Sequence, residues 1–76
     1  MGAEAERLAR MALAQAEDVG RKELITADCR RIGQACAKQG RKFEGLSYAR
    51  RAVDLYKVLR SPNLAEAQAV LKQCEG

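Results

Sequence analysis

The side chains of this sequence whose types and spacing could do chemistry are basic and amide groups between residues 21 and 41. Arg30, Gln34, Lys38 and Arg41 recur three or four positions apart, with Arg31 beside the first of them, so on a helix they form one polar stripe. A guanidinium donates two parallel charge-assisted hydrogen bonds to a carboxylate, and several cations along one wall attract an acidic segment. The stripe therefore predicts a partner-binding surface for an acidic peptide. The alternative interpretation is that these side chains are simply solvated on the outside of a helix.

The remaining residue types do not favour catalysis. The chain has no His, so it has neither an imidazole base nor a Ser–His or Cys–His pair, and its carboxylates are scattered. Cys29 and Cys36 lie seven positions apart, about 10 Å along a helix, which is too far for a disulfide. We expect three small, buried hydrophobic cysteines; the alternative for Cys74, which lies near the end of the chain, is a partly exposed thiol. The sequence predicts a protein that is not an enzyme and has no cofactor or metal.

Length and composition predict one small helical domain over residues 1–76. Hydrophobic residues make up 47% of the chain, many of them Ala, and the chain has one Pro and no Trp. Ala, Leu, Glu, Gln, Lys and Arg dominate, and these residues favour helices. No stretch is long and apolar enough to span a membrane, and the acidic start is unlike a signal peptide. We therefore expect an all-α, cytoplasmic protein.

The net charge of +4 allows a second functional interpretation, the binding of nucleic acid. The positive charge is concentrated between residues 21 and 61, and the pairs Arg30-Arg31 and Arg50-Arg51 would permit contact with phosphates. Aromatic residues make up only 4% of the chain, and no recognition-helix motif stands out. Nucleic acid is therefore the less favoured partner, and protein or peptide the preferred one.

Four helices are expected to position these side chains, over about residues 3–19, 21–39, 42–59 and 64–74. Gly20 and Gly40 are placed to end the first two helices, and Pro62 breaks the chain after the third. Short connections make consecutive helices antiparallel neighbours. The apolar positions predict the buried faces, and these include Leu8, Met11, Ala12, Val19, Leu24, Ile25, Ile32, Phe43, Leu46, Val53, Tyr56, Leu59, Leu64, Val70 and Leu71. Ala5, Ala9, Leu13 and Ala16 widen the stripe of the first helix to over half its circumference, which predicts a helix contacted from two sides.

The sequence also repeats itself at an offset of 40 residues. Gly45, Ala49, Ala52 and Val53 align with Ala5, Ala9, Ala12 and Leu13, so small residues align with small residues. Such spacing allows a neighbouring helix to approach closely. We expect the first and third helices to pack in the same way.

The segment from Cys29 to Ala52 resembles a tetratricopeptide repeat (TPR). Its helix–turn–helix pattern matches at Ile32-Gly33, at the turn residue Gly40, and at the small positions Gly45, Ala49 and Ala52. Cys29 and Cys36 stand where the family has an aromatic pair, and Pro62 comes five residues later than the family's proline. The resemblance implies four antiparallel helices in a right-handed TPR-like stack.

The resemblance also implies a function, because TPR proteins bind extended peptides in a groove lined by the first helix of each pair. It therefore predicts a protein–protein interaction module or small adaptor, with the groove between the second and fourth helices as its peptide site. Arg30 and Gln34 have the spacing of the family's clamp for a peptide carboxylate. The first and last helices would each lack a neighbour, so the chain is either part of a longer array or completes its core by self-association, for example as a homodimer.

Overall fold

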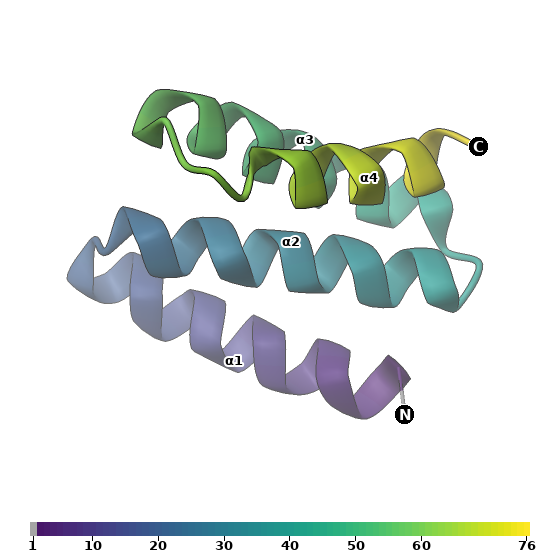
Figure 1. The fold of residues 1–76 in the computed structure, drawn as a ribbon. Coiled ribbons are helices and arrows are strands. Elements are labelled where there is room, and N and C mark those ends of the chain that lie inside the picture. Colours follow the sequence, from purple (N-terminus) through teal and green to yellow (C-terminus); the bar gives the residue numbers. More distant parts are fainter. Residues whose placement is uncertain (1) are drawn as a thin grey trace.

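The computed structural model describes residues 2–76 and is all-α. The helices are α1 (Gly2–Val19), α2 (Lys22–Lys38), α3 (Lys42–Leu59) and α4 (Leu64–Glu75), and the described residues contain no strand. Consecutive helices run in opposite directions (Figure 1). The predicted helices are therefore confirmed to within one or two residues at each end.

The turns after α1 and α2 have the same structure. Gly20 and Gly40 adopt φ values of 72° and 77°, in the left-handed region that glycine enters without steric cost. One residue later, the backbone N–H of Arg41 donates to the carbonyl of Cys36 at 2.8 Å, and that of Arg21 donates to Ala16 at 3.1 Å. Both bonds satisfy carbonyls left open at the helix end, as the two glycines predicted.

The turn after α3 has this hydrogen bond without a glycine. Arg60 occupies the left-handed conformation at φ 54°, and the N–H of Ser61 donates to the carbonyl of Tyr56 at 3.1 Å. Pro62 follows, as expected for a residue that cannot continue a helix. A non-glycine residue in this conformation costs about 1–2 kcal/mol, so this turn is the strained one of the three.

Helix α2 is the centre of the fold. It packs against α1, α3 and α4, while α4 also packs on α3. In Figure 1, α2 and α4 lie side by side on the near side, with α1 and α3 behind them. Among residues 2–76, no Cα atom of α1 lies within 8 Å of one in α3 or α4. Helix α1 is thus held through α2 and through long side chains.

Glycines allow a close crossing between α2 and α3. A Cβ atom built on Gly45 would lie 2.9 Å from the Cβ of Cys36 and 3.0 Å from the carbonyl oxygen of Gly33. Ala49 and Ala52 follow on the same helix and are fully buried. The prediction that small residues mark close helix approaches is therefore confirmed at these positions.

The predicted buried face of α1 is wrong in part. Leu8, Met11 and Val19 are 51%, 53% and 66% exposed, whereas the predicted Ala9, Leu13 and Ala16 are buried, together with Glu6. The first helix was expected to be touched from two sides, but in this structure only α2 lies along it. One side of its broad apolar face is therefore open to solvent.

Two other expected core residues are also exposed. Leu24 is 45% exposed on α2, and Phe43 is 92% exposed at the start of α3. Cys74 is buried, with its thiol 3.6 Å from the carbonyl oxygen of Gly33, so only the alternative of a partly exposed Cys74 is wrong. Cys29 and Cys36 are fully buried free thiols, as predicted. None of the helices described is long and apolar enough to pass through a membrane.

Candidate functional site

The predicted clamp residue Arg30 lies on the face formed by α2 and α4, and its positive charge is already paired with a carboxylate. The Arg30 side chain is 20% exposed, and its guanidinium lies 3.8 Å from the carboxylate of Glu66 on α4. Its Nε atom is buried and has no hydrogen-bond partner among the described residues. A peptide carboxylate would have to displace Glu66 in order to bind here.

The other predicted residues of α2 have different surroundings. Arg31 is 59% exposed and lies 3.3 Å from the buried carboxylate of Asp28, its neighbour one turn earlier. Gln34 is half-buried, and Lys38 is exposed in the last turn of α2. The fold therefore places Arg30, Gln34 and Lys38 along one row at intervals of four residues, while the charge of Arg31 is partly neutralised.

Arg41 does not belong to this row. Helix α2 ends at Lys38, and Arg41 follows the Gly40 turn as the residue that precedes α3. Its guanidinium lies 2.6 Å from the carboxylate of Glu6 on α1. The placement of Arg41 on the helical stripe is therefore wrong, because the turn interrupts the periodicity and directs the side chain toward α1.

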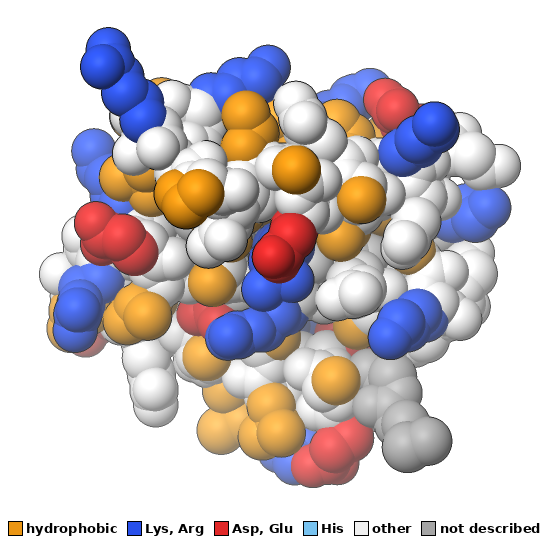
Figure 2. Space-filling view, in the orientation of Figure 1, with side chains coloured by type: hydrophobic (Ala, Val, Ile, Leu, Met, Phe, Trp, Pro, Cys, Tyr) orange, Lys and Arg blue, Asp and Glu red, His pale blue; other side chains and the backbone are white. Residues whose placement is uncertain are grey.

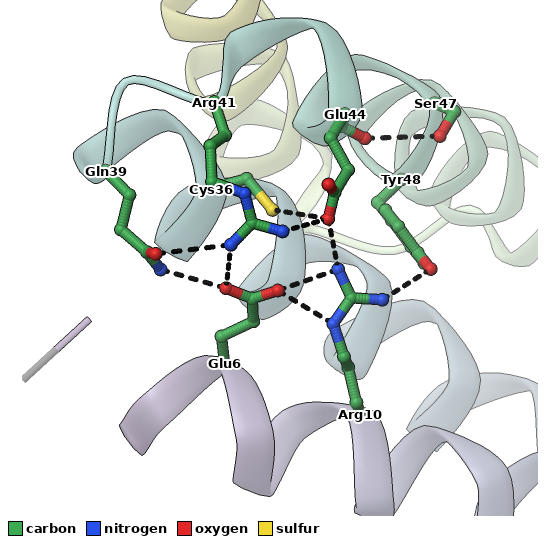
Figure 3. A network of polar contacts seen from close by, with 8 residues as sticks. All are labelled: Glu6, Arg10, Cys36, Gln39, Arg41, Glu44, Ser47 and Tyr48. Atoms are coloured by element: carbon green, nitrogen blue, oxygen red, sulfur yellow. Dashed lines mark hydrogen bonds and ion pairs between the residues drawn. The ribbon is translucent and has the colours of Figure 1, made fainter. Parts of the chain in front are cut away.

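Arg41 instead belongs to a polar network that ties α1 to the turn between α2 and α3 (Figure 3). The buried carboxylate of Glu6 accepts hydrogen bonds from Arg41 at 2.6 Å, from Arg10 at 2.8 Å and from Gln39 at 2.9 Å. Hydrogen bonds from the two guanidinium groups lower the pKa of Glu6 from 4.5 to about 2. Glu6 is thus a charged member of an otherwise apolar face.

Arg10 extends the same network to α3. Its guanidinium donates to the carboxylate of Glu44 at 2.6 Å and to the hydroxyl of Tyr48 at 2.8 Å, and it lies 5.1 Å from the centre of the Tyr48 ring. Arg41 also pairs with Glu44. Two carboxylates and two guanidinium groups balance one another, so the network joins helices without leaving a net charge to attract a ligand.

One group in this network has the composition of a metal site. The ligand atoms of Glu6, Cys36 and Glu44 lie within 4.8 Å of one another. Both carboxylates already accept hydrogen bonds from guanidinium groups, and burial raises the pKa of the Cys36 thiol, which disfavours the thiolate that metals bind. The residues therefore fit an internal ion-pair network better than a metal centre.

A basic pocket lies where α2 ends, α3 begins and α4 ends. Its volume is about 450 Å³, and it is lined by Ala37, Lys38, Lys42, Lys72, Gln73 and Gly76. Among residues 2–76, none of the three lysines has a carboxylate within 4.0 Å. Figure 2 shows Lys and Arg side chains around this right-hand end of the molecule. We call the group Lys38, Lys42 and Lys72 the lysine pocket.

Only Lys38 of the lysine pocket was predicted from the sequence. Lys42 lies beyond the turn and Lys72 lies 34 residues after Lys38, so neither belongs to the periodicity of the second helix. The available signal was topological, because four antiparallel helices bring the second turn and the end of the fourth helix to the same end of the molecule.

Comparisons with known proteins add no assignment to this geometry. A scan against protein-family models, a search of curated proteins and a search of solved structures each found no match to the chain. The resemblance to the tetratricopeptide repeat therefore rests on the residues of this sequence alone.

Proposed function

We propose that the chain is a non-enzymatic protein-interaction module that binds an acidic peptide segment along the face formed by α2 and α4. The peptide's carboxylates would be held by the lysine pocket. The observation that carries this proposal is that three lysines line one pocket and have no carboxylate within 4.0 Å among residues 2–76. Cations left unpaired around a concave site attract an anionic ligand and steer its approach.

Helix stability explains the positions of only two of the three lysines. Lys38 and Lys72 lie in the last turns of α2 and α4, where the helix dipole favours a positive charge. Lys42 is the first residue of α3, where the dipole disfavours one. Gathering the three like charges also opposes folding. Helix stability does not explain Lys42, whereas the binding of a ligand with carboxylates does.

A TPR-like stack is the arrangement we propose for the four helices. It is supported by the contact between α2 and α4, by the absence of such contact between α1 and α3 within the described chain, and by the close crossing at Gly33 and Gly45. In such a stack α2 and α4 would be the groove-lining helices. The lysine pocket would then lie at one end of the groove, with Gln34 and Arg30 further along it.

The proposal can be tested by fluorescence anisotropy with a labelled peptide of alternating Glu and Ser. The matched control peptide replaces each Glu with Gln. Exposed ion pairs contribute about 0.2–1 kcal/mol each, so we expect the triple variant Lys38→Gln, Lys42→Gln, Lys72→Gln to weaken binding by about tenfold. The control protein variant, Lys22→Gln with Lys57→Gln and Arg50→Gln, removes three exposed charges elsewhere and should bind as the parent does.

Three results would overturn this function. The first is equal binding of the acidic and neutral peptides. The second is equal loss of affinity in the two triple variants, which would show that net charge alone attracts the peptide. The third is tighter binding of a single-stranded oligonucleotide than of the peptide, with the steep salt dependence of phosphate contacts, which would favour the nucleic-acid interpretation.

A further inference from the structure

A second surface lies on α1, away from the lysine pocket. Leu8, Met11 and Val19 are more than half exposed, and Ala12 is half-buried between them. Leu24 of α2 continues this surface, and a pocket of about 430 Å³ lies between the two helices. Figure 2 shows hydrophobic side chains gathered at the lower edge of the molecule, over α1. We call Leu8, Met11, Ala12, Val19 and Leu24 the α1 surface.

The internal repeat indicates what kind of group covers such a surface. At the offset of 40 residues, Leu8 and Ala12 correspond to Tyr48 and Ala52 of α3, which are half-buried and fully buried. Those positions belong to the side of α3 that begins at Gly45 and lies against α2. Met11 corresponds to the exposed Arg51, so the part of the α1 surface around Leu8 and Ala12 is the counterpart of a face that another helix covers within the same chain.

The charges beside the α1 surface favour a second copy of α1, running antiparallel, as the covering helix. Glu4 and Arg7 lie at its N-terminal end and pair only with each other, at 2.9 Å and with both side chains largely exposed. Asp18 and Arg21 lie at the other end and have no opposite charge within 4.0 Å among residues 2–76. Each end therefore carries one charge of each sign.

We propose that two copies of the chain associate through their α1 surfaces about a twofold axis that passes between positions 12 and 13. Arg7 and Asp18 lie about 8 Å on either side of that axis along α1, at 1.5 Å per residue. The symmetry places Arg7 opposite Asp18 of the partner subunit. It also brings the turn after α1, with Arg21, to the end of the partner subunit's α1 where Glu4 lies. Leu8 then lies opposite the stretch between Gln15 and Val19 of the partner subunit. A parallel arrangement would instead bring like charges together.

Such a dimer would leave the lysine pocket of each copy accessible, because α1 does not contact α4 in the described chain. Two pockets on one particle would bind a partner with two acidic segments more tightly than one pocket would. This consequence rests on the proposed function, whereas the dimer itself depends only on the α1 surface.

The test is sedimentation equilibrium of the full chain, from micromolar to near-millimolar concentration. We expect reversible dimerisation, with Met11→Glu raising the dissociation constant by at least about tenfold. Phe43→Glu is the matched control, since Phe43 is an exposed apolar residue of α3 outside the α1 surface, and it should leave the dissociation constant unchanged. Helical content measured by circular dichroism should be the same in all three proteins.

Charge reversal tests the antiparallel register separately. Arg7→Glu should weaken the dimer, and adding Asp18→Arg should restore it, since each interface contains the pair twice. A wild-type chain that stays monomeric at every concentration overturns the proposal, as does equal dissociation by Met11→Glu and Phe43→Glu. If the chain stays monomeric and binds a synthetic peptide with the sequence of residues 22–38, the covering helix resembles α2 and not α1. That result also overturns the proposal. None of these results depends on binding of an acidic peptide.

Discussion

Replacing Gly45 with Ala adds one methyl group where α3 crosses close to α2. Its carbon atom would lie 2.9 Å from the Cβ of Cys36, 3.0 Å from the carbonyl oxygen of Gly33 and 3.1 Å from the Sγ of Cys74. Only the Cys74 sulfur ends a side chain that can rotate away. The other two atoms are fixed to the α2 backbone, so α2 and α3 have to move apart.

The expected loss of stability follows from two opposing contributions. Overpacking a well-packed crossing costs about 1–3 kcal/mol. Alanine is favoured over glycine in a helix interior by about 1 kcal/mol, which offsets part of that cost. The contacts of 2.9 and 3.0 Å with atoms fixed to α2 place the overpacking cost in the upper part of that range, so we expect Gly45→Ala to lower the free energy of unfolding by about 1–2 kcal/mol. In a domain of this size, that corresponds to a fall in Tm of about 4–16 °C.

Gly33→Ala is the matched control, because it adds the same atom to the same crossing from the other helix. Its Cβ would lie 3.3 Å from the backbone nitrogen of Ala49, 3.3 Å from the carbonyl oxygen of Gly45 and 3.4 Å from the Ala49 Cβ, so α3 would have to shift by only a few tenths of an ångström. Helix propensity offsets this smaller strain, and we expect a change within about 0.5 kcal/mol. Urea titrations followed by circular dichroism measure both variants. A Gly45→Ala protein as stable as the parent would refute the reasoning.

Three further predictions concern charge, backbone strain and thiol burial. Glu6 is stabilised in its charged form, with its pKa lowered from 4.5 to about 2, so stability should be full above pH 4.5 and decline as pH falls toward 2. Because its arginine partners are 36% and 40% exposed, we expect Glu6→Gln to lower the free energy of unfolding by only about 1–2 kcal/mol near neutral pH. In urea titrations at several pH values, this variant should lose less stability on acidification than the parent does. An unchanged dependence of stability on pH would contradict the network. Arg60→Gly should raise the free energy of unfolding by about 1 kcal/mol by relieving the left-handed backbone, and no gain in the same titration would show that the turn is unstrained. Burial raises the pKa of Cys29, Cys36 and Cys74, so all three thiols should resist a thiol-reactive dye in the native protein and react in urea; rapid labelling of any one before unfolding would place it at the surface.

The polar network on α1 illustrates why the candidate sites were only partly predictable. Glu6 and Arg10 are separated by four positions, which predicts one pair on a helix. Their other partners, Arg41 and Glu44, lie more than thirty positions away, and nothing in the spacing connects them. The same holds for the lysine pocket, in which only Lys38 belongs to the predicted stripe. Contacts across helices depend on how the helices rotate and pack, and periodicity along one helix does not contain that information.

The sequence by itself determined the four helices, their turns and one close crossing, because these features depend on local chemistry. Strong helix formers, two glycines that accept positive φ and one proline place four helices and their turns, and small residues mark the crossing of α2 with α3. Each of these features depends on residues close together in the chain or on the size of one side chain.

Only the tertiary structure decided which apolar residues are buried and which charges are paired. Helix α1 is apolar over more than half its circumference, and the pattern alone does not say which part a neighbour covers. Burial depends on the number and direction of neighbouring helices, and α1 has one neighbour along its length where two were expected. For that reason Leu8 and Met11 face solvent while Glu6 lies buried among arginines.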